Sequence, residues 1–272
     1  MVTIHTNAGA MVAQAAFRSV NNSLDMVSKR VNTGYKVAGA IDDASTFAVA
    51  QGLRGDVKSL DAVSSTLSRA VGVGEVALAS AETVSSLVQD VKSKVTQMSN
   101  DSLTTTERAA YEADLVALTS QITNAINQAT FSGKNALTSS TDSVFLSDES
   151  GSTISVRAQN IDTNSATLVT ALTGTVTGAT TGGTAQTAID TFESALNTSL
   201  GQLGADVRGV QAQQELISKR IDATEKGIGA LVDADLAKES SRLQALQTQQ
   251  QLAVQAISIA NQGPSVLLSL FR

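Results

Sequence analysis

The most regular pattern in the chain is an apolar stripe near its C-terminus. Its positions alternate in steps of three and four residues and comprise Val232, Leu236, Glu239, Leu243, Leu246, Gln250, Ala253, Ile257 and Ala260. This spacing predicts a helix with a coiled-coil seam, about 46 Å long over residues 232–262 at ~1.5 Å per residue. One partner helix cannot cover every apolar side chain of this segment, because four lie off the seam: Leu231, Leu252, Val254 and Ile259.

A second stripe near the N-terminus predicts the partner of that seam. A helix can begin at Thr6 or Asn7, which are both favourable N-caps. Its apolar positions again follow steps of three and four: Phe17, Val20, Leu24, Val27 and Val31. Gly34 suits the left-handed position that ends a helix. We therefore expect the two ends of the chain to pair as long helices.

Two further helical patterns follow. One starts at Ser45 and can run to about Met98, with local weakness expected at Gly72 and Gly74, which cost about 1 kcal/mol each relative to Ala. The next begins after a capping box, in which Glu107 follows Thr104 by three residues. Its apolar positions are Tyr111, Leu115, Leu118, Ile122 and Ile126.

The segment 138–184 has a different character, because Ser, Thr and Gly dominate it. The runs "SVFLS" and "STISVRA" flank "DESG", which predicts a β-hairpin. "TGTVTGATTGGTA", residues 173–185, is turn-rich and predicts a surface loop. The helical period then returns from Ala185 and merges into the terminal stripe through Ile189, Phe192, Leu196, Leu203, Val207, Val210, Ile217, Ile221 and Ile228.

These patterns define a fold class. We expect a mainly α protein, in which long antiparallel helices form a coiled-coil-like bundle from both termini. The β-hairpin and loop material occupies only the middle of the chain. The single proline, Pro264, agrees with long uninterrupted helices, and the 3% aromatic content excludes a core filled by large rings.

Composition excludes several functions. The net charge is −6, whereas a nucleic-acid-binding protein normally has a basic surface, so we expect no nucleic-acid partner. No run approaches the roughly 18 apolar residues of a membrane span, so we expect no membrane insertion. His5 is the only histidine and there is no cysteine, so a catalytic triad or a His/Cys metal site lacks its parts. We expect no enzyme activity, no catalytic residue, no metal and no cofactor. Asp233 and Asp235 are interpreted as charges on different faces of a helix.

Three stretches carry a family resemblance: "TNAGAM" at 6–11, "RVNTGYKVAGAIDDASTFAVAQGLR" at 30–54, and nearly all of 231–272, including "LQALQTQQQL" and the terminal "SLFR". Together they resemble bacterial flagellin, and in particular the short flagellins of alphaproteobacteria. The likeness is strongest over roughly the first 100 and last 50 residues.

The resemblance implies a structural subunit that assembles into the extracellular flagellar filament for swimming motility and is exported unfolded through the flagellar type III apparatus. Implied partners are other flagellin subunits, the export apparatus, a flagellin chaperone, and hook-associated and cap proteins. It also implies an inner polymerisation domain from residues 1–42 and 231–272 and a helical second domain from 43–137 and 185–230. Residues 138–184 would form a variable outward segment.

The resemblance also assigns residues. Asp42, Asp43 and Arg54 match the family's connector and the start of its second domain, where polar contacts would fix the angle between domains or subunits. The alternative is that the two Asp residues only charge the N-terminus of a helix. The full set expected at polymerisation interfaces is Phe17, Leu24, Val31, Gly34, Asp42, Asp43, Gln51, Leu53, Arg54, Leu243, Leu246, Gln250, Leu252, Ile257, Leu270, Phe271 and Arg272.

Two other classes remain open at this point. A hook–filament junction protein is built on a similar terminal plan. A cytoplasmic signalling coiled coil shares Ala-, Ser- and Gln-rich heptads, but it would lack the central hairpin. The sequence also departs from the family at Ser132, where flagellins usually have Asn; we expect this change to be tolerated.

Overall fold

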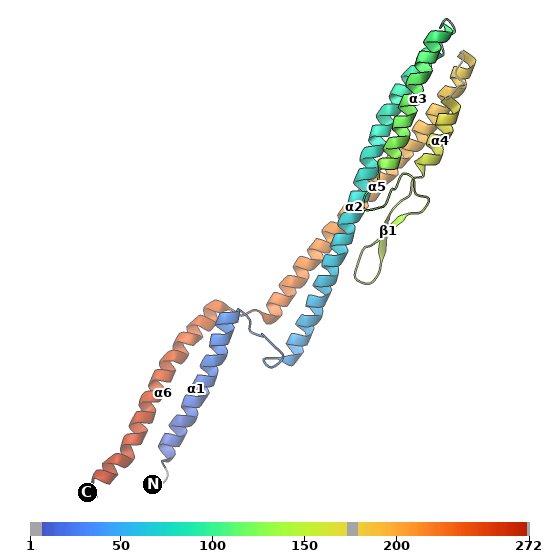
Figure 1. The fold of residues 1–272 in the computed structure, drawn as a ribbon. Helices are drawn as coiled ribbons and strands as arrows, with labels where there is room; N and C mark the ends of the chain where they lie inside the picture. The colour runs from blue at the N-terminus through green and yellow to red at the C-terminus, as the bar shows by residue number, and fades with distance from the viewer. Residues whose placement is uncertain (1–6, 173–178, 271–272) are drawn as a thin grey trace. The chain divides into compact units, whose positions relative to one another are not determined.

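The computed structural model describes the backbone of residues 7–172 and 179–270, with side chains described except at 179–180 and 263–270. In chain order its elements are α1 (Ala8–Thr33), α2 (Ala44–Met98), α3 (Thr105–Gln128), β1 (Ser143–Leu146), β2 (Thr153–Val156), α4 (Ile161–Leu172), α5 (Ala179–Val232) and α6 (Leu236–Leu270) (Figure 1). The mainly α class with a small central hairpin is therefore confirmed.

The chain divides into two compact units. Unit 1 comprises Met1–Gly55 and Ala223–Arg272, and unit 2 comprises Asp56–Asp222. The sequence had suggested a division at 42/43 and 230/231. The boundaries between the two units instead lie after Gly55 and after Asp222. The first turns of α2 and the last turns of α5 therefore belong to unit 1.

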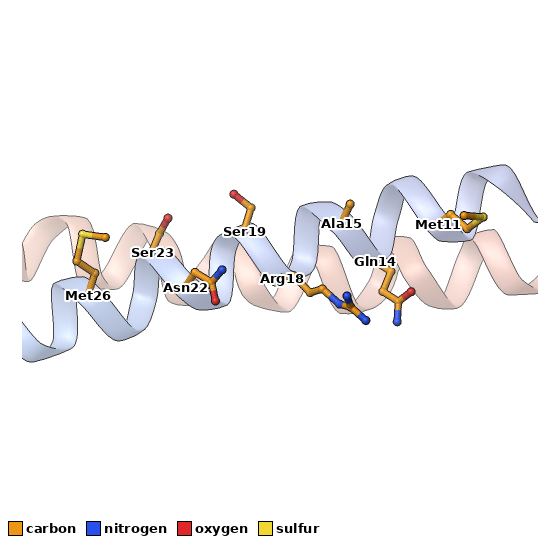
Figure 2. A pocket seen from close by; sticks show the side chains of 8 residues that line it. All are labelled: Met11, Gln14, Ala15, Arg18, Ser19, Asn22, Ser23 and Met26. Atoms are coloured by element: carbon orange, nitrogen blue, oxygen red, sulfur yellow. The ribbon is translucent and has the colours of Figure 1, made fainter. Parts of the chain in front are cut away.

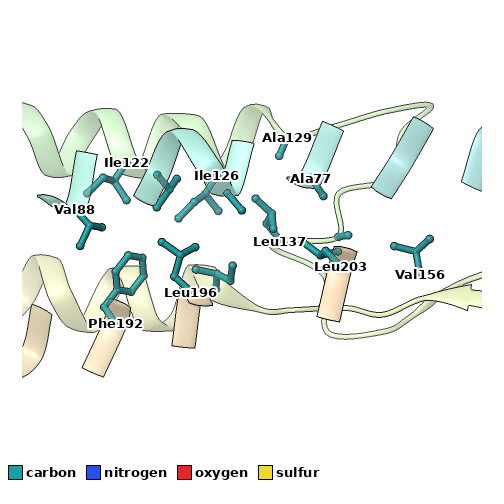
Figure 3. Close-up of a cluster of buried hydrophobic side chains, with 14 of the residues drawn as sticks. Ala77, Val88, Ile122, Ile126, Ala129, Leu137, Val156, Phe192, Leu196 and Leu203 are labelled. Atoms are coloured by element: carbon teal, nitrogen blue, oxygen red, sulfur yellow. The ribbon is translucent and has the colours of Figure 1, made fainter. Parts of the chain in front are cut away.

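Unit 2 has a continuous apolar core built on the predicted stripes of α2, α3 and α5. Leu67, Ile122 and Phe192 are among its largest fully buried side chains. Figure 3 shows how Val88, Ile126 and Leu196 reach the same interior from different helices. Burial of each such side chain contributes about 1.5–3 kcal/mol, so this unit has the apolar interior of an independently stable domain.

The ends of the helices follow the predicted capping signals. The Asn7 side chain accepts a hydrogen bond from the Ala10 amide at 3.0 Å, and Gly34 ends α1 with a φ of 74°. At α3, the Thr104 side chain accepts from the Glu107 amide while the Glu107 carboxylate accepts from the Thr104 amide. The predicted capping box is thus confirmed.

The hairpin pairs β1 with β2 antiparallel, with Ser143 opposite Val156 and Leu146 opposite Thr153. Two hydrogen bonds join the C-terminal end of the hairpin to Asp206 of α5. The Arg157 Nε donates to Asp206 Oδ1 at 3.0 Å, and the Arg157 amide donates to Asp206 Oδ2 at 2.9 Å. Such bidentate, charge-assisted pairing fixes geometry as well as charge. The predicted hairpin is confirmed.

One prediction for the middle of the chain was wrong, and one helix was not predicted. Residues 173–185 were expected to form a surface loop, but α5 already begins at Ala179. The Ser/Thr-rich segment also contains α4, which had no counterpart in the sequence analysis. Ile161, Leu168 and Leu172 of α4 are buried against the core. Segment 173–178 lies outside the described residues.

A third correction concerns the start of the terminal helix. A continuous helix was expected through Val232, but α5 ends there and α6 begins at Leu236. The Asp235 carboxylate accepts hydrogen bonds from the Ala237 and Lys238 amides, so it caps α6. The interpretation of Asp233 and Asp235 as charges on different faces of a helix was therefore wrong, because both lie between α5 and α6.

One described helix, α2, contains an 18-residue window with a mean hydropathy of 1.3, which is long and apolar enough to cross a membrane. This test is also passed by core helices of soluble proteins. The apolar stripe of α2, including Val84, Val88 and Val91, belongs to the core of unit 2.

Candidate functional site: the paired terminal helices

In unit 1, α1 and α6 pack side by side along their lengths (Figure 1). The predicted seam of α1 faces inward, since Val27 is buried and Phe17, Leu24 and Val31 are half-buried. On α6, Leu246 is buried, and Leu243, Gln250 and Ile257 are half-buried. Leu236 is the exception among the predicted seam positions, because it is 49% exposed at the first residue of α6.

Three side-chain hydrogen bonds cross between the two helices and show that they run antiparallel. Asn7 Nδ2 donates to the Ala260 carbonyl at 2.8 Å, and Gln250 Nε2 donates to Asn21 Oδ1 at 2.8 Å. At the other end, Arg30 Nη1 donates to Glu239 Oε1 at 3.4 Å. Arg30, Asn21 and Asn7 were not among the predicted site residues. A polar side chain at a seam position, such as Glu239, was the signal that a polar partner must face it.

Backbone hydrogen bonds extend this pairing beyond the helix ends. The Val232 carbonyl accepts from the Lys36 amide at 2.7 Å, and the Gly34 carbonyl accepts from the Ala234 amide at 2.8 Å. Tyr35 and Asp233 form an isolated antiparallel bridge. Gly34 therefore has two roles, because its left-handed backbone ends α1 and its carbonyl holds the segment between α5 and α6.

The connector after α1 is organised by two carboxylates. Asp42 accepts hydrogen bonds from the Ala38 and Gly39 amides and pairs with Lys29 at 3.3 Å; these partners, the Ala38 amide above all, lower the pKa of Asp42. Asp43 accepts from the Thr46 hydroxyl and amide and from the Ser45 amide, which lowers the pKa of Asp43 and caps α2. The capping role considered for Asp43 is thus present.

The remaining predicted residues are partly accounted for. The Arg54 guanidinium lies 5.9 Å from the ring centre of Tyr35 and donates to Gln51 at 3.1 Å. Leu53 is half-buried. Leu252, which was expected to lie off the seam, is exposed. Leu270 ends α6, but its side chain, together with Phe271 and Arg272, lies outside the described residues, as does His5.

The opposite face of α1 is exposed in the described part of the chain. Figure 2 shows a shallow groove along that face, running from Met11 past Arg18 to Met26. Met11 is 62% exposed and the neighbouring Val12 is 71% exposed. On α6, the off-seam residues Leu252, Val254 and Ile259 are likewise more than half exposed. The pair thus has a covered inner seam, and its outer faces carry solvent-exposed apolar side chains among polar ones.

The described residues contain no cluster of three or more His, Asp or Glu side chains placed to hold a metal ion. The arrangement is that of an α-helical protein in which segments from both ends of the chain form one unit.

Comparison with known proteins identifies its family. The model of the bacterial flagellin N-terminal helical region matches residues 4–142, and that of the C-terminal helical region matches residues 184–271. The chain is 39% identical to flagellin FljK of Caulobacter vibrioides, over 99% of this chain and 98% of that protein. It is 34% identical to a flagellin of Brucella melitensis over the whole of both chains. The chain therefore belongs to the bacterial flagellins, and it is a structural subunit of the flagellar filament.

Proposed function

We propose that the outer faces of α1 and α6 are the surfaces through which neighbouring copies of this flagellin polymerise, and that unit 1 is its inner, polymerising domain. Identical copies that repeat one non-closing contact build a helical polymer. The half-buried seam residues, among them Phe17, Leu24, Leu243 and Ile257, hold α1 and α6 together so that their outer faces can be presented. Leu252 lies on such an outer face.

The distribution of exposed apolar side chains carries this proposal. Among the described residues, eight of the ten large apolar side chains that are more than half exposed belong to unit 1, although unit 1 is the smaller unit. They are Met11, Val12, Met26, Ile41, Val49, Leu252, Val254 and Ile259; the two in unit 2 are Val144 and Leu216. Exposed apolar surface concentrated in this way is typical of interaction surfaces.

Unit 1 also has little interior of its own. The continuous apolar core consists entirely of residues from unit 2. A helix acquires most of its stability from packing of its apolar face, and two helices cover only one seam. Coverage by adjacent subunits would supply the missing apolar contacts.

A pair of point substitutions tests the proposal. The double variant Leu252→Gln/Ile259→Gln keeps good helix formers on α6 but removes two exposed apolar contacts. Since covering one such side chain contributes about 1 kcal/mol or more, we expect the critical concentration for seeded polymerisation to rise by about tenfold or more. Val116→Gln, at a 44% exposed position of α3, is the matched control and should polymerise normally. Unchanged polymerisation of the double variant, measured by sedimentation and electron microscopy, would contradict the proposal.

Truncation gives an independent test. Removal of residues 250–272 should abolish polymerisation and leave unit 2 folded, because the core of unit 2 contains none of these residues. The similarity to flagellins, which extends over nearly the full length of the chain, favours a filament subunit over a hook–filament junction protein. The central hairpin disfavours a signalling coiled coil.

Family membership supports the remaining assignments. We place the assembled protein outside the cell, in the flagellum, and infer export through the flagellar type III apparatus with the help of a flagellin chaperone. Hook-associated and cap proteins would contact the ends of the filament. The absence of cysteine suits export as an unfolded chain, because no disulfide can form on the way.

A further inference from the structure

The apolar part of the α1–α6 seam does not by itself define how far the two helices are shifted along one another. Apart from Phe17, the covered apolar positions of α1 repeat Val and Leu, and the covered apolar positions of α6 are Leu, Ile and Ala. A shift by seven residues places similar aliphatic side chains opposite one another again, because seven residues is the repeat of the pattern. A seam of this kind needs another feature to select one register.

The polar contacts across the seam supply such a feature. Asn7–Ala260, Asn21–Gln250 and Arg30–Glu239 are spread along the pair, and we call them the polar rungs. Between the first and the last polar rung, the residue number rises by 23 on the α1 side, from 7 to 30, and falls by 21 on the α6 side, from 260 to 239. The rungs thus all belong to one antiparallel register.

The rung between Arg30 and Glu239 is poorly suited to add stability. Glu239 is only 9% exposed, and its nearest contact with Arg30 is a long 3.4 Å. Its second carboxylate oxygen, Oε2, is buried and accepts no hydrogen bond from the described residues. A buried carboxylate that is incompletely paired costs free energy relative to an apolar side chain of similar size. Stability alone would therefore favour Leu at this seam position.

We propose that Arg30–Glu239 and Asn21–Gln250 are register-determining contacts, which select one alignment of α1 against α6 rather than strengthen the pair. A shift by one heptad would set Glu239 level with residue 23 or 37 and would move it about 10 Å along the helix axis from Arg30. Gln250 and Asn21 would lose one another in the same step. Each shifted alignment is thus penalised twice, whereas the apolar positions are nearly indifferent to it.

Cysteine cross-linking in the full-length chain tests this proposal, because the natural chain has no cysteine. Interpolation between the rungs puts Leu24 level with Leu246. Leu246→Cys is combined with Leu24→Cys for the observed register, or with Phe17→Cys or Val31→Cys for shifts of one heptad. A heptad corresponds to about 10 Å along the helix axis, well beyond the reach of a disulfide. Intrachain cross-links are quantified after oxidation, both in the free chain and in filaments.

With Arg30 and Glu239 present, the 24–246 cross-link should exceed the other two by about tenfold or more, since a disulfide needs Cα atoms within about 7 Å. In a variant that replaces both pairs, Arg30→Leu/Glu239→Leu/Asn21→Leu/Gln250→Leu, helix content by circular dichroism should be retained while the shifted cross-links approach the yield of the native one. A preserved preference for 24–246 in this variant would overturn the proposal, because apolar packing would then set the register.

A charge exchange keeps the test decisive if the Leu variant does not pair. Arg30→Glu alone places two carboxylates at one rung and should weaken the preference for the 24–246 cross-link. Arg30→Glu/Glu239→Arg should restore it, because the exchanged pair is again matched only in the observed register. Failure of the exchanged pair to recover more preference than the single variant would also overturn the proposal.

Discussion

Gly74 of α2 lies directly against Val207 of α5: a Cβ atom at Gly74 would be only 2.5 Å from Val207 Cγ2. The sequence suggested that Gly74 weakens its helix. The structure shows instead that the missing side chain lets α2 and α5 approach closely inside unit 2. Val207 is itself buried and β-branched, so its side chain has little freedom to move away.

Gly74→Ala should therefore destabilise unit 2 by roughly 1–3 kcal/mol, the usual cost of overpacking, despite the better helix propensity of Ala. Gly201→Ala in α5 is the matched control, because no atom lies within 4 Å of its added Cβ. This control should stabilise by about 0.5–1 kcal/mol. Urea unfolding followed by circular dichroism measures both. Stabilisation by Gly74→Ala would show that α2 and α5 can separate at little cost.

Ser132 occupies a turn that favours a different residue. Phe131 and Lys134 exchange two backbone hydrogen bonds around Ser132 and Gly133, whose φ angles are 51° and 76°. Two positive φ angles between such a pair are the requirement of a type I′ turn, for which Asn-Gly is the preferred sequence. This geometry gives a physical reason for the Asn usually found here in flagellins.

Ser132→Asn should accordingly raise the stability of unit 2 by up to about 1 kcal/mol, because Asn tolerates the left-handed region better than Ser. Ser132→Val should lower it, since a β-branched residue is strained there. The two melting temperatures, compared with that of the parent, measure the effect. Equal melting temperatures for the Asn and Val variants would contradict the turn assignment.

The capping box of α3 predicts a dependence on pH. Hydrogen bonds from the Thr104 hydroxyl and then the Thr104 amide lower the pKa of Glu107 from its usual 4.5. A carboxyl whose pKa is lowered on folding stabilises the protein above its unfolded pKa and loses that contribution as the pH falls through the folded value. The difference in urea midpoint between the parent and Glu107→Ala should be full near neutral pH and should shrink below about pH 4.5. A difference that stays constant down to pH 2.5 would exclude the carboxylate as its source.

Arg54 provides a test of the connector. Its contacts in the free chain are Tyr35 and Gln51, both within unit 1. If Arg54 also contacts a neighbouring subunit, Arg54→Glu should shorten or distort filaments while leaving the helix content of the soluble protein unchanged. Arg54→Lys, which keeps the charge, should be much milder. Filaments of normal length and shape from Arg54→Glu would restrict the role of Arg54 to its own chain.

The fold was largely predictable because its determinants are local. The seam positions of α1 and α6, the Asn7 and Gly34 caps and the Thr104 capping box are each written in a few neighbouring residues. The hairpin followed from alternating residues around a turn. These signals do not depend on contacts with distant parts of the chain.

The misses have physical causes as well. In α4, Ser165 occupies a buried position between Ile161 and Leu168, so that a genuine helical stripe is hidden by its polar residue and by frequent Thr. The end of α5 was missed because the apolar period continues across Asp233–Asp235, where Asp235 caps a new helix. The sequence identified the seam of the site, but not the polar partners across it, because the facing of Arg30 and Glu239 depends on residues 209 positions apart.

The large separation in sequence between α1 and α6 has a consequence for the order in which the chain folds. The contact between Asn7 and Ala260 joins residues 253 positions apart, so α1 can pair with α6 only after residue 260 has been synthesised. Closing so long a loop is entropically costly unless the intervening residues have condensed first. A chain truncated before α6 would retain the residues of the apolar core of unit 2, but α1 would have no helix to pack against. The packing of the first helix therefore depends on the presence of the last one.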